Sequence, residues 1–163
     1  MTLWATVAGG VVGTVVLTTG LRLAQELGLT RMDIPLLLGT VFTAHRSRAN
    51  VIGYFLHFVN GVLFALAYYA IFRAVGHAGW LFGLALGLVH GLFAGGALVN
   101  VLLPAVHPRM GTPWSDAEET PLLEPPGFLL ENYGSRTALG NLAAHLLYGA
   151  IVGGFAAHLT GWT

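Results

Sequence analysis

Apolar residues dominate four long stretches of this chain, and no charged residue interrupts any of them. The stretches that contain no Lys, Arg, Asp or Glu are 1–21, 49–72, 74–108 and 137–163. A helix that crosses a bilayer needs about 20 mostly apolar residues, and each stretch reaches that length. The pattern predicts an all-helical single domain over 1–163 with four membrane-spanning helices, at about 3–24, 50–73, 79–103 and 137–160.

Composition indicates the same class of protein. Hydrophobic residues form 55% of the 163 residues and charged residues only 9%, whereas soluble domains carry about 25% charged residues. So few charges cannot cover a surface that faces water, and we therefore expect an integral membrane protein in contact with the lipid bilayer. The net charge is zero, and no basic tract indicates a nucleic-acid partner.

Two linkers separate the spans. The first contains an apolar piece, 34–44, which is too short to cross a membrane. Asp33 and Pro35 at its start suit a helix cap and a first helical turn, so we expect a short interfacial helix. The second linker is the loop 104–136, where the sequence that starts at Glu124 loosely repeats this pattern. The two similar linkers predict that the chain is built from two parallel helical-hairpin repeats.

The arginines predict the orientation in the membrane. Six of the seven fall within or beside the two linkers, and only Arg73 falls on the opposite side. An excess of basic residues marks the cytoplasmic side of a membrane protein. We therefore expect both linkers in the cytoplasm and both termini outside.

Small residues recur at intervals of four along the spans. Residues four apart form one stripe on a helix, and small residues on such a stripe let membrane helices approach closely. The candidate packing glycines are Gly9, Gly13, Gly83, Gly87, Gly91, Gly95, Gly149 and Gly153. We expect this glycine zipper to pack the four helices into a compact bundle. Contact between copies, in a homodimer or a larger membrane complex, is the alternative.

Two histidines, His57 and His145, lie on stripes of this kind and are expected to face the bundle interior at similar depth. An ionisable side chain inside a membrane is costly and usually serves a function. Asn60 and Tyr148 each follow one of these histidines by three residues, on nearly the same helix face. His90 is expected nearer the bilayer centre. These five residues are the candidates for binding a ligand or a metal.

Three interpretations of this polar column remain open. In the first, neutral imidazoles hydrogen-bond across the helices, and the protein is a structural or accessory membrane module. In the second, His57 and His145 bind a haem iron or a transition metal, because imidazole suits iron, copper and zinc. The lack of carboxylates in the spans favours haem over zinc. In the third, the histidines conduct protons or bind a quinone or small solute, because histidine titrates near neutral pH.

The spans contain no catalytic constellation, because they hold no carboxylate. The sequence therefore leaves open whether the chain is an enzyme. A polar cluster is expected at the cytoplasmic interface, and its members are Asp33, His107, Arg109, Glu124 and Glu131. We interpret this cluster as a solvated network at the membrane edge.

Four short motifs carry a resemblance to known proteins. They are His-Phe-Val-Asn-Gly at 57–61, His-Pro-Arg-Met-Gly at 107–111, Glu-Pro-Pro-Gly-Phe at 124–128 and His-Leu-Leu-Tyr-Gly at 145–149. With these motifs the chain resembles small bacterial four-helix integral membrane proteins of unknown function. The resemblance implies the fold and a location in the bacterial plasma (inner) membrane, and it implies no particular chemistry.

Overall fold

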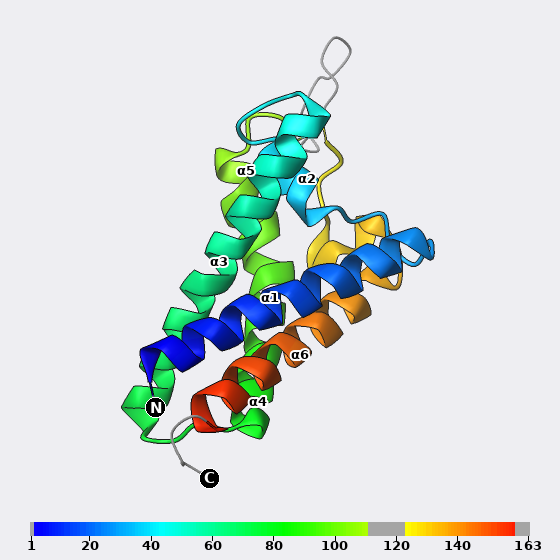
Figure 1. The fold of residues 1–163 in the computed structure, drawn as a ribbon. Coiled ribbons are helices and arrows are strands. Elements are labelled where there is room, and N and C mark those ends of the chain that lie inside the picture. Colours follow the sequence, from blue (N-terminus) through cyan, green and yellow to red (C-terminus); the bar gives the residue numbers. More distant parts are fainter. Residues whose placement is uncertain (1, 111–122, 159–163) are drawn as a thin grey trace.

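A computed structural model describes residues 2–110 and 123–158 of the chain (Figure 1). Four of its helices are long and apolar enough to cross a membrane. They are Leu3–Glu26, Arg46–Val75, Trp80–Val106 and Thr137–His158. The prediction of an all-helical chain with four long apolar helices is confirmed. Part of the predicted loop, 111–122, and the last two residues of the predicted fourth span lie outside the described residues.

The elements follow one another in a simple order. They are α1 (Leu3–Glu26), α2 (Ile34–Gly39), α3 (Arg46–Val75), α4 (Trp80–Phe93), η1 (Ala94–Leu102), α5 (Leu103–Val106), η2 (Phe128–Tyr133) and α6 (Thr137–His158). In Figure 1, α1 and α6 run side by side, while α3 and the continuous α4–η1–α5 helix lean away from them toward the end where α2 lies.

The most extensive helix contact joins α4 to α6, and glycines make it possible. A Cβ atom on Gly83 would lie 2.9 Å from the Cα of Gly153, and one on Gly149 would lie 2.8 Å from the Cα of Gly87. These distances are shorter than van der Waals contact, so the two backbones touch where side chains are missing. Close backbone packing of this kind is the usual role of small residues between membrane helices.

Glycines also place α1 between α6 and α3. A Cβ atom on Gly9 would lie 3.1 Å from the Cα of Val152, and one on Gly13 would lie 2.8 Å from the ring of Tyr148. On the other side of α1, Gly10 faces Ala65 of α3. Helix α1 therefore contacts two neighbours through different faces.

Helix α2 is shorter than the predicted segment 34–44, because it ends at Gly39. Its start agrees with the predicted cap, since Oδ1 of Asp33 accepts a hydrogen bond of 3.0 Å from the Leu36 N–H. The helix packs tightly on α3, where a Cβ on Gly39 would collide with the Ala49 backbone and a Cβ on Gly53 with that of Pro35. The absence of a side chain at these two glycines thus allows α2 to pack directly against α3.

The third long helix differs from the uniform α-helix predicted for 79–103, because residues Ala94–Leu102 form a π-helix, η1. The side chain of Asn100 occupies two backbone acceptors there, with Nδ2 2.7 Å from the Gly95 carbonyl oxygen and 2.9 Å from that of Gly96. Pro104, just beyond, has no N–H to donate. π-helical turns are rare and often mark functional sites.

Candidate functional site: a histidine-lined cavity between the helices

A cavity of about 470 Å³ lies between the long helices, bordered by α2, η1 and Leu130 of η2. We call it the histidine cavity. Its wall is mostly apolar, and among the described residues that line it none is Asp, Glu, Lys or Arg. The polar side chains in the wall are those of Thr14, His57, Asn60, His90, Asn141, His145 and Tyr148. Small-molecule sites are typically apolar cavities of about 300–1,000 Å³ with a few polar groups.

All five residues singled out from the sequence as ligand or metal candidates line this cavity. His57 and Asn60 come from α3, His90 from α4, and His145 and Tyr148 from α6. The rings of His90 and His145 are in direct contact, with their centres 4.6 Å apart and nearly perpendicular. The sequence analysis placed His90 nearer the bilayer centre, apart from the other two histidines, and did not foresee this contact.

His145 has one ring nitrogen in a hydrogen bond to the protein. Its Nδ1 lies 2.8 Å from the carbonyl oxygen of Asn141, and a carbonyl oxygen only accepts hydrogen bonds. Nδ1 must therefore carry the hydrogen, and Nε2 has the lone pair in the neutral ring. The Asn141 side chain, which is 1% exposed, donates to the Gly91 carbonyl oxygen over 3.0 Å. Sequence reasoning missed Asn141, although its place four residues before His145 in an uncharged span was a usable signal.

His90 lies in a box of aromatic rings. Its imidazole stacks on Phe64, with ring centres 3.7 Å apart, and meets the rings of Tyr68 and Tyr148 edge to face at 6.0 and 5.6 Å. Nδ1 of His90 is buried and has no hydrogen-bond partner among the described residues. The sequence analysis did not single out Phe64 or Tyr68.

Two more buried polar atoms, one on a lining residue and one on a tyrosine whose ring meets that of His90, lack a partner within the part of the chain that the structure describes. They are Nε2 of His57 and the hydroxyl oxygen of Tyr68. The Tyr148 hydroxyl does have one, since it donates to the Gly61 carbonyl oxygen. Leaving a buried polar group unpaired costs about 1–3 kcal/mol. Three such atoms, on His57, Tyr68 and His90, lie in or beside the wall of this cavity.

His57 also borders a second pocket, of about 20 Å³, on the side of the α1–α2 linker. Arg22, Asp33 and Tyr54 line this smaller pocket with it. Nη1 of Arg22 and Oδ2 of Asp33 form an ion pair of 3.6 Å. His57 thus stands between the apolar cavity and a charged group near the linker.

The five residues predicted as one interfacial cluster are distributed over separate contacts. Asp33 and Glu124 line one shallow pocket with Arg31, whereas His107 and Arg109 bind the end of α2. Glu131 is exposed. The structure therefore shows two separate polar contacts, one at the linker before α2 and one at the C-terminal end of α2, in place of one cluster.

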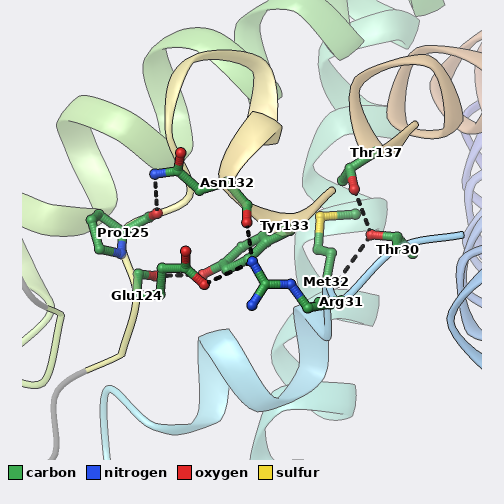
Figure 2. A network of polar contacts seen from close by, with 8 residues as sticks. All are labelled: Thr30, Arg31, Met32, Glu124, Pro125, Asn132, Tyr133 and Thr137. Carbon is green, nitrogen blue, oxygen red and sulfur yellow. Dashed lines mark hydrogen bonds and ion pairs between the residues drawn. The ribbon is translucent and has the colours of Figure 1, made fainter. Parts of the chain in front are cut away.

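The first of these contacts joins the α1–α2 linker to the segment before α6 (Figure 2). The guanidinium of Arg31 pairs with the Glu124 carboxylate at 3.2 Å and donates to the carbonyl oxygen of Asn132. The Tyr133 hydroxyl donates to the Glu124 carbonyl oxygen over 2.8 Å. Burial, and secondly the charge of Glu124, raise the pKa of Tyr133 to about 12, so this hydroxyl keeps its proton at physiological pH.

The second contact holds the end of the third long helix against α2. Nδ1 of His107 accepts a hydrogen bond of 3.1 Å from the Arg109 backbone N–H, and Nε2 lies 3.0 Å from the Leu37 carbonyl oxygen. Nε2 therefore carries the hydrogen in a neutral ring. The Arg109 side chain donates to the Thr40 carbonyl oxygen over 2.7 Å. His107 is only 4% exposed, and this burial lowers its pKa below the ordinary value of 6.5.

His107 is expected to make folding pH-dependent. Because its pKa is lower in the folded state, the unfolded chain binds a proton at higher pH than the folded chain does. The contribution of neutral His107 to the free energy of unfolding is fully present above about pH 6.5. It is lost as the pH falls from there toward the lowered pKa. In detergent, the unfolding temperature should drop between about pH 6.5 and pH 5, and less steeply for His107→Gln, which keeps a donor for Leu37. Arg109 is the charged residue in contact with His107. Parallel pH profiles for the two proteins would contradict this prediction.

Fold and site together define a chain with four helices able to span a membrane, around an apolar cavity with three histidines in its wall. No protein-family model, no curated protein and no solved structure matches the chain. Its function is therefore inferred from the geometry of the cavity.

Proposed function

We propose that this chain is an integral membrane protein that binds a small, uncharged and largely apolar molecule in the histidine cavity. The observation that carries the proposal is the pair of buried, unpartnered ring nitrogens, Nε2 of His57 and Nδ1 of His90, in the wall of an apolar cavity of about 470 Å³. Native proteins leave few buried polar atoms unpaired, and those that they do leave call for an explanation. A bound molecule with oxygen or nitrogen atoms would supply the missing partners.

The charge of the wall supports an uncharged ligand. No acidic or basic side chain is among the described residues that line the cavity. Placing a charge in such an environment without a partner of opposite sign is strongly unfavourable. The proposed ligand is therefore of the quinone or small-solute type that the sequence left open as its third interpretation.

The interpretation as a purely structural module has less support from the geometry. It requires the imidazoles to hydrogen-bond across helices, to Asn60, Tyr148 or backbone carbonyls. Among the described residues, the hydrogen bond of His145 stays within its own helix, to Asn141. The Tyr148 hydroxyl bonds to the Gly61 carbonyl oxygen and not to a histidine. Packing alone therefore leaves the nitrogens of His57 and His90 unexplained.

Haem binding is a second candidate function, and one observation favours it. Metal-binding histidines commonly donate their other N–H to a backbone carbonyl, as His145 does toward Asn141. Nε2 of His145 and Nε2 of His57 are thus both free to ligate an iron. The described residues contain no group of three or more His, Asp or Glu that could hold a metal ion. A visible absorption spectrum and a metal analysis of the purified protein distinguish the two functions. A haem absorption band would show that the bound molecule is haem and not the proposed solute.

The proposed ligand site is tested by filling the cavity. Val99 lines the cavity, so Val99→Phe should displace a bound molecule, whereas Val89→Phe, on a side chain that is 64% exposed, should not. Each protein is purified from its own membranes, extracted with organic solvent and analysed by mass spectrometry. We expect a compound that accompanies the wild type and Val89→Phe and is depleted at least tenfold in Val99→Phe. The same compounds at the same levels in all three would contradict the proposal.

The proposed location is the bacterial plasma membrane, with both linkers in the cytoplasm and both termini outside. The arginine distribution supports this orientation. The chain has no cysteine, so single cysteines at the exposed positions Ser47, Ser135 and His77 give a clean readout. In intact cells, a membrane-impermeant maleimide should label only His77→Cys. Labelling of Ser47→Cys or Ser135→Cys instead would reverse the orientation.

A further inference from the structure

We infer that the molecule in the histidine cavity carries a hydroxyl group on an aromatic ring, as a phenol or hydroquinone does, and that this hydroxyl donates a hydrogen bond to Nε2 of His145. The inference rests on the proposed function and names the class of ligand. Four features of the cavity lead to it.

The first feature is the fixed tautomer of His145. Its Nδ1 hydrogen points to the Asn141 carbonyl oxygen, which lies 2.8 Å away and cannot donate. In a neutral imidazole one nitrogen donates and the other accepts. Nε2 of His145 is therefore an acceptor and needs a donor. The ring stays neutral because no carboxylate among the described lining residues could balance a buried positive charge.

The second feature is that two polar side chains on the same helix as His145 donate their hydrogens elsewhere. The Tyr148 hydroxyl donates to the Gly61 carbonyl oxygen, and the Asn141 amide donates to that of Gly91. The His90 ring touches His145, but the two rings meet edge to face at 4.6 Å and form no hydrogen bond. These two donors are thus not available to Nε2, and a hydroxyl on a molecule inside the cavity would supply one.

The third feature is the pair of unpartnered ring nitrogens on the other two histidines. Each neutral imidazole carries one N–H and one lone pair, and Nε2 of His57 and Nδ1 of His90 are buried with no hydrogen-bond partner among the described residues. A hydroxyl oxygen can accept from one of them while its hydrogen goes to His145. A ketone or an ether can only accept, so it would leave Nε2 of His145 unpaired. The site is thus complementary to a hydroxyl.

The fourth feature is the aromatic wall. Phe64, His90 and Tyr148 line the cavity, and the His90 ring stacks on Phe64 at 3.7 Å and meets Tyr148 edge to face. Aromatic rings pack favourably against other rings in offset-stacked or edge-to-face arrangements. A hydroxyl carried on an aromatic ring therefore suits both the polar and the apolar part of the wall.

The test compares 4-butylphenol with 4-butylanisole, its methyl ether, which keeps the oxygen and loses the donor. Binding to the full chain in detergent micelles is measured by isothermal titration calorimetry, and Val99→Phe gives the contribution of the micelles. We expect the phenol to bind at least tenfold more tightly than the anisole, since sites built for a hydroxyl reject analogues that lack it. ¹⁵N NMR should show a protonated Nδ1 in His145 and a shift of its Nε2 on addition of the phenol.

Two variants of His145 separate the hydrogen bond from ligand size. His145→Gln keeps an acceptor near the position of Nε2 and should retain the preference for the phenol. His145→Asn keeps a donor for Asn141 but has no acceptor there, so the preference should fall below threefold. Equal affinity of wild type for both compounds, abolished by Val99→Phe, would overturn this inference and leave the proposed ligand site intact. Binding of neither compound above the Val99→Phe baseline would count against the proposed ligand site itself.

Discussion

Leucine in place of Gly87 is expected to prevent the chain from folding or to lower its stability by about 3 kcal/mol or more, because overpacking against backbone atoms cannot be relieved by a change of rotamer. A Cβ at this position would collide with the His145 carbonyl oxygen and lie 3.0 Å from the Cα of Leu146. The helices α4 and α6 would have to separate, and the histidine cavity would lose its wall. The yield of monodisperse protein and its thermal unfolding in detergent measure the effect.

Gly140 provides the matched control for this substitution. It lies in α6, and a Cβ there would meet no atom within 4 Å. Because leucine favours the helix over glycine by about 0.5–1 kcal/mol, Gly140→Leu should leave the stability unchanged or raise it slightly. Unchanged yield and unfolding temperature for Gly87→Leu would show that the α4–α6 contact does not hold the fold together.

Phenylalanine in place of His90 is expected to have the opposite effect on stability. The substitution keeps an aromatic ring against Phe64 and removes a buried Nδ1 that has no partner among the described residues. The stability of the ligand-free protein should therefore rise by about 1–3 kcal/mol, while ligand binding weakens because one of the two unpartnered imidazoles in the wall is removed. A functional site that lowers the stability of the empty protein is a common trade-off.

The control for His90→Phe is Leu88→Phe, on the same helix at a side chain that is 42% exposed. It should change neither stability nor binding. Thermal unfolding without ligand, together with calorimetry with 4-butylphenol, gives both quantities. If His90→Phe instead destabilised the protein as a core truncation does, His90 would be a packing residue, and the structural interpretation would regain support.

The sequence alone determined which parts of the chain are long helices. The charge-free stretches predicted the four apolar helices to within about four residues at the ends, since length and hydropathy are local properties that a sequence displays directly. The same reasoning selected His57, Asn60, His90, His145 and Tyr148, because polar side chains stand out in an apolar span.

Only the tertiary structure decided how these residues relate to one another. Depth along a helix can be counted from the sequence, but the rotation and tilt of two helices depend on their contact, and here the backbone contact of α4 with α6 brings His90 against His145. The π-helix η1 could not be predicted from the sequence either, because it depends on how the Asn100 amide competes for the carbonyls of Gly95 and Gly96.

The hydrogen-bonding state of the histidines depends on the tertiary structure in the same way. Whether an imidazole is satisfied is decided by which donors and acceptors neighbouring helices bring within about 3 Å. The sequence contains Asn60 and Tyr148 near the histidines, yet the folded chain directs the Tyr148 hydroxyl to Gly61 and leaves nitrogens of His57 and His90 unpaired. Hydropathy and spacing thus determined where the helices are, whereas the cavity and its unpaired nitrogens arise from distances between helices that no local pattern encodes.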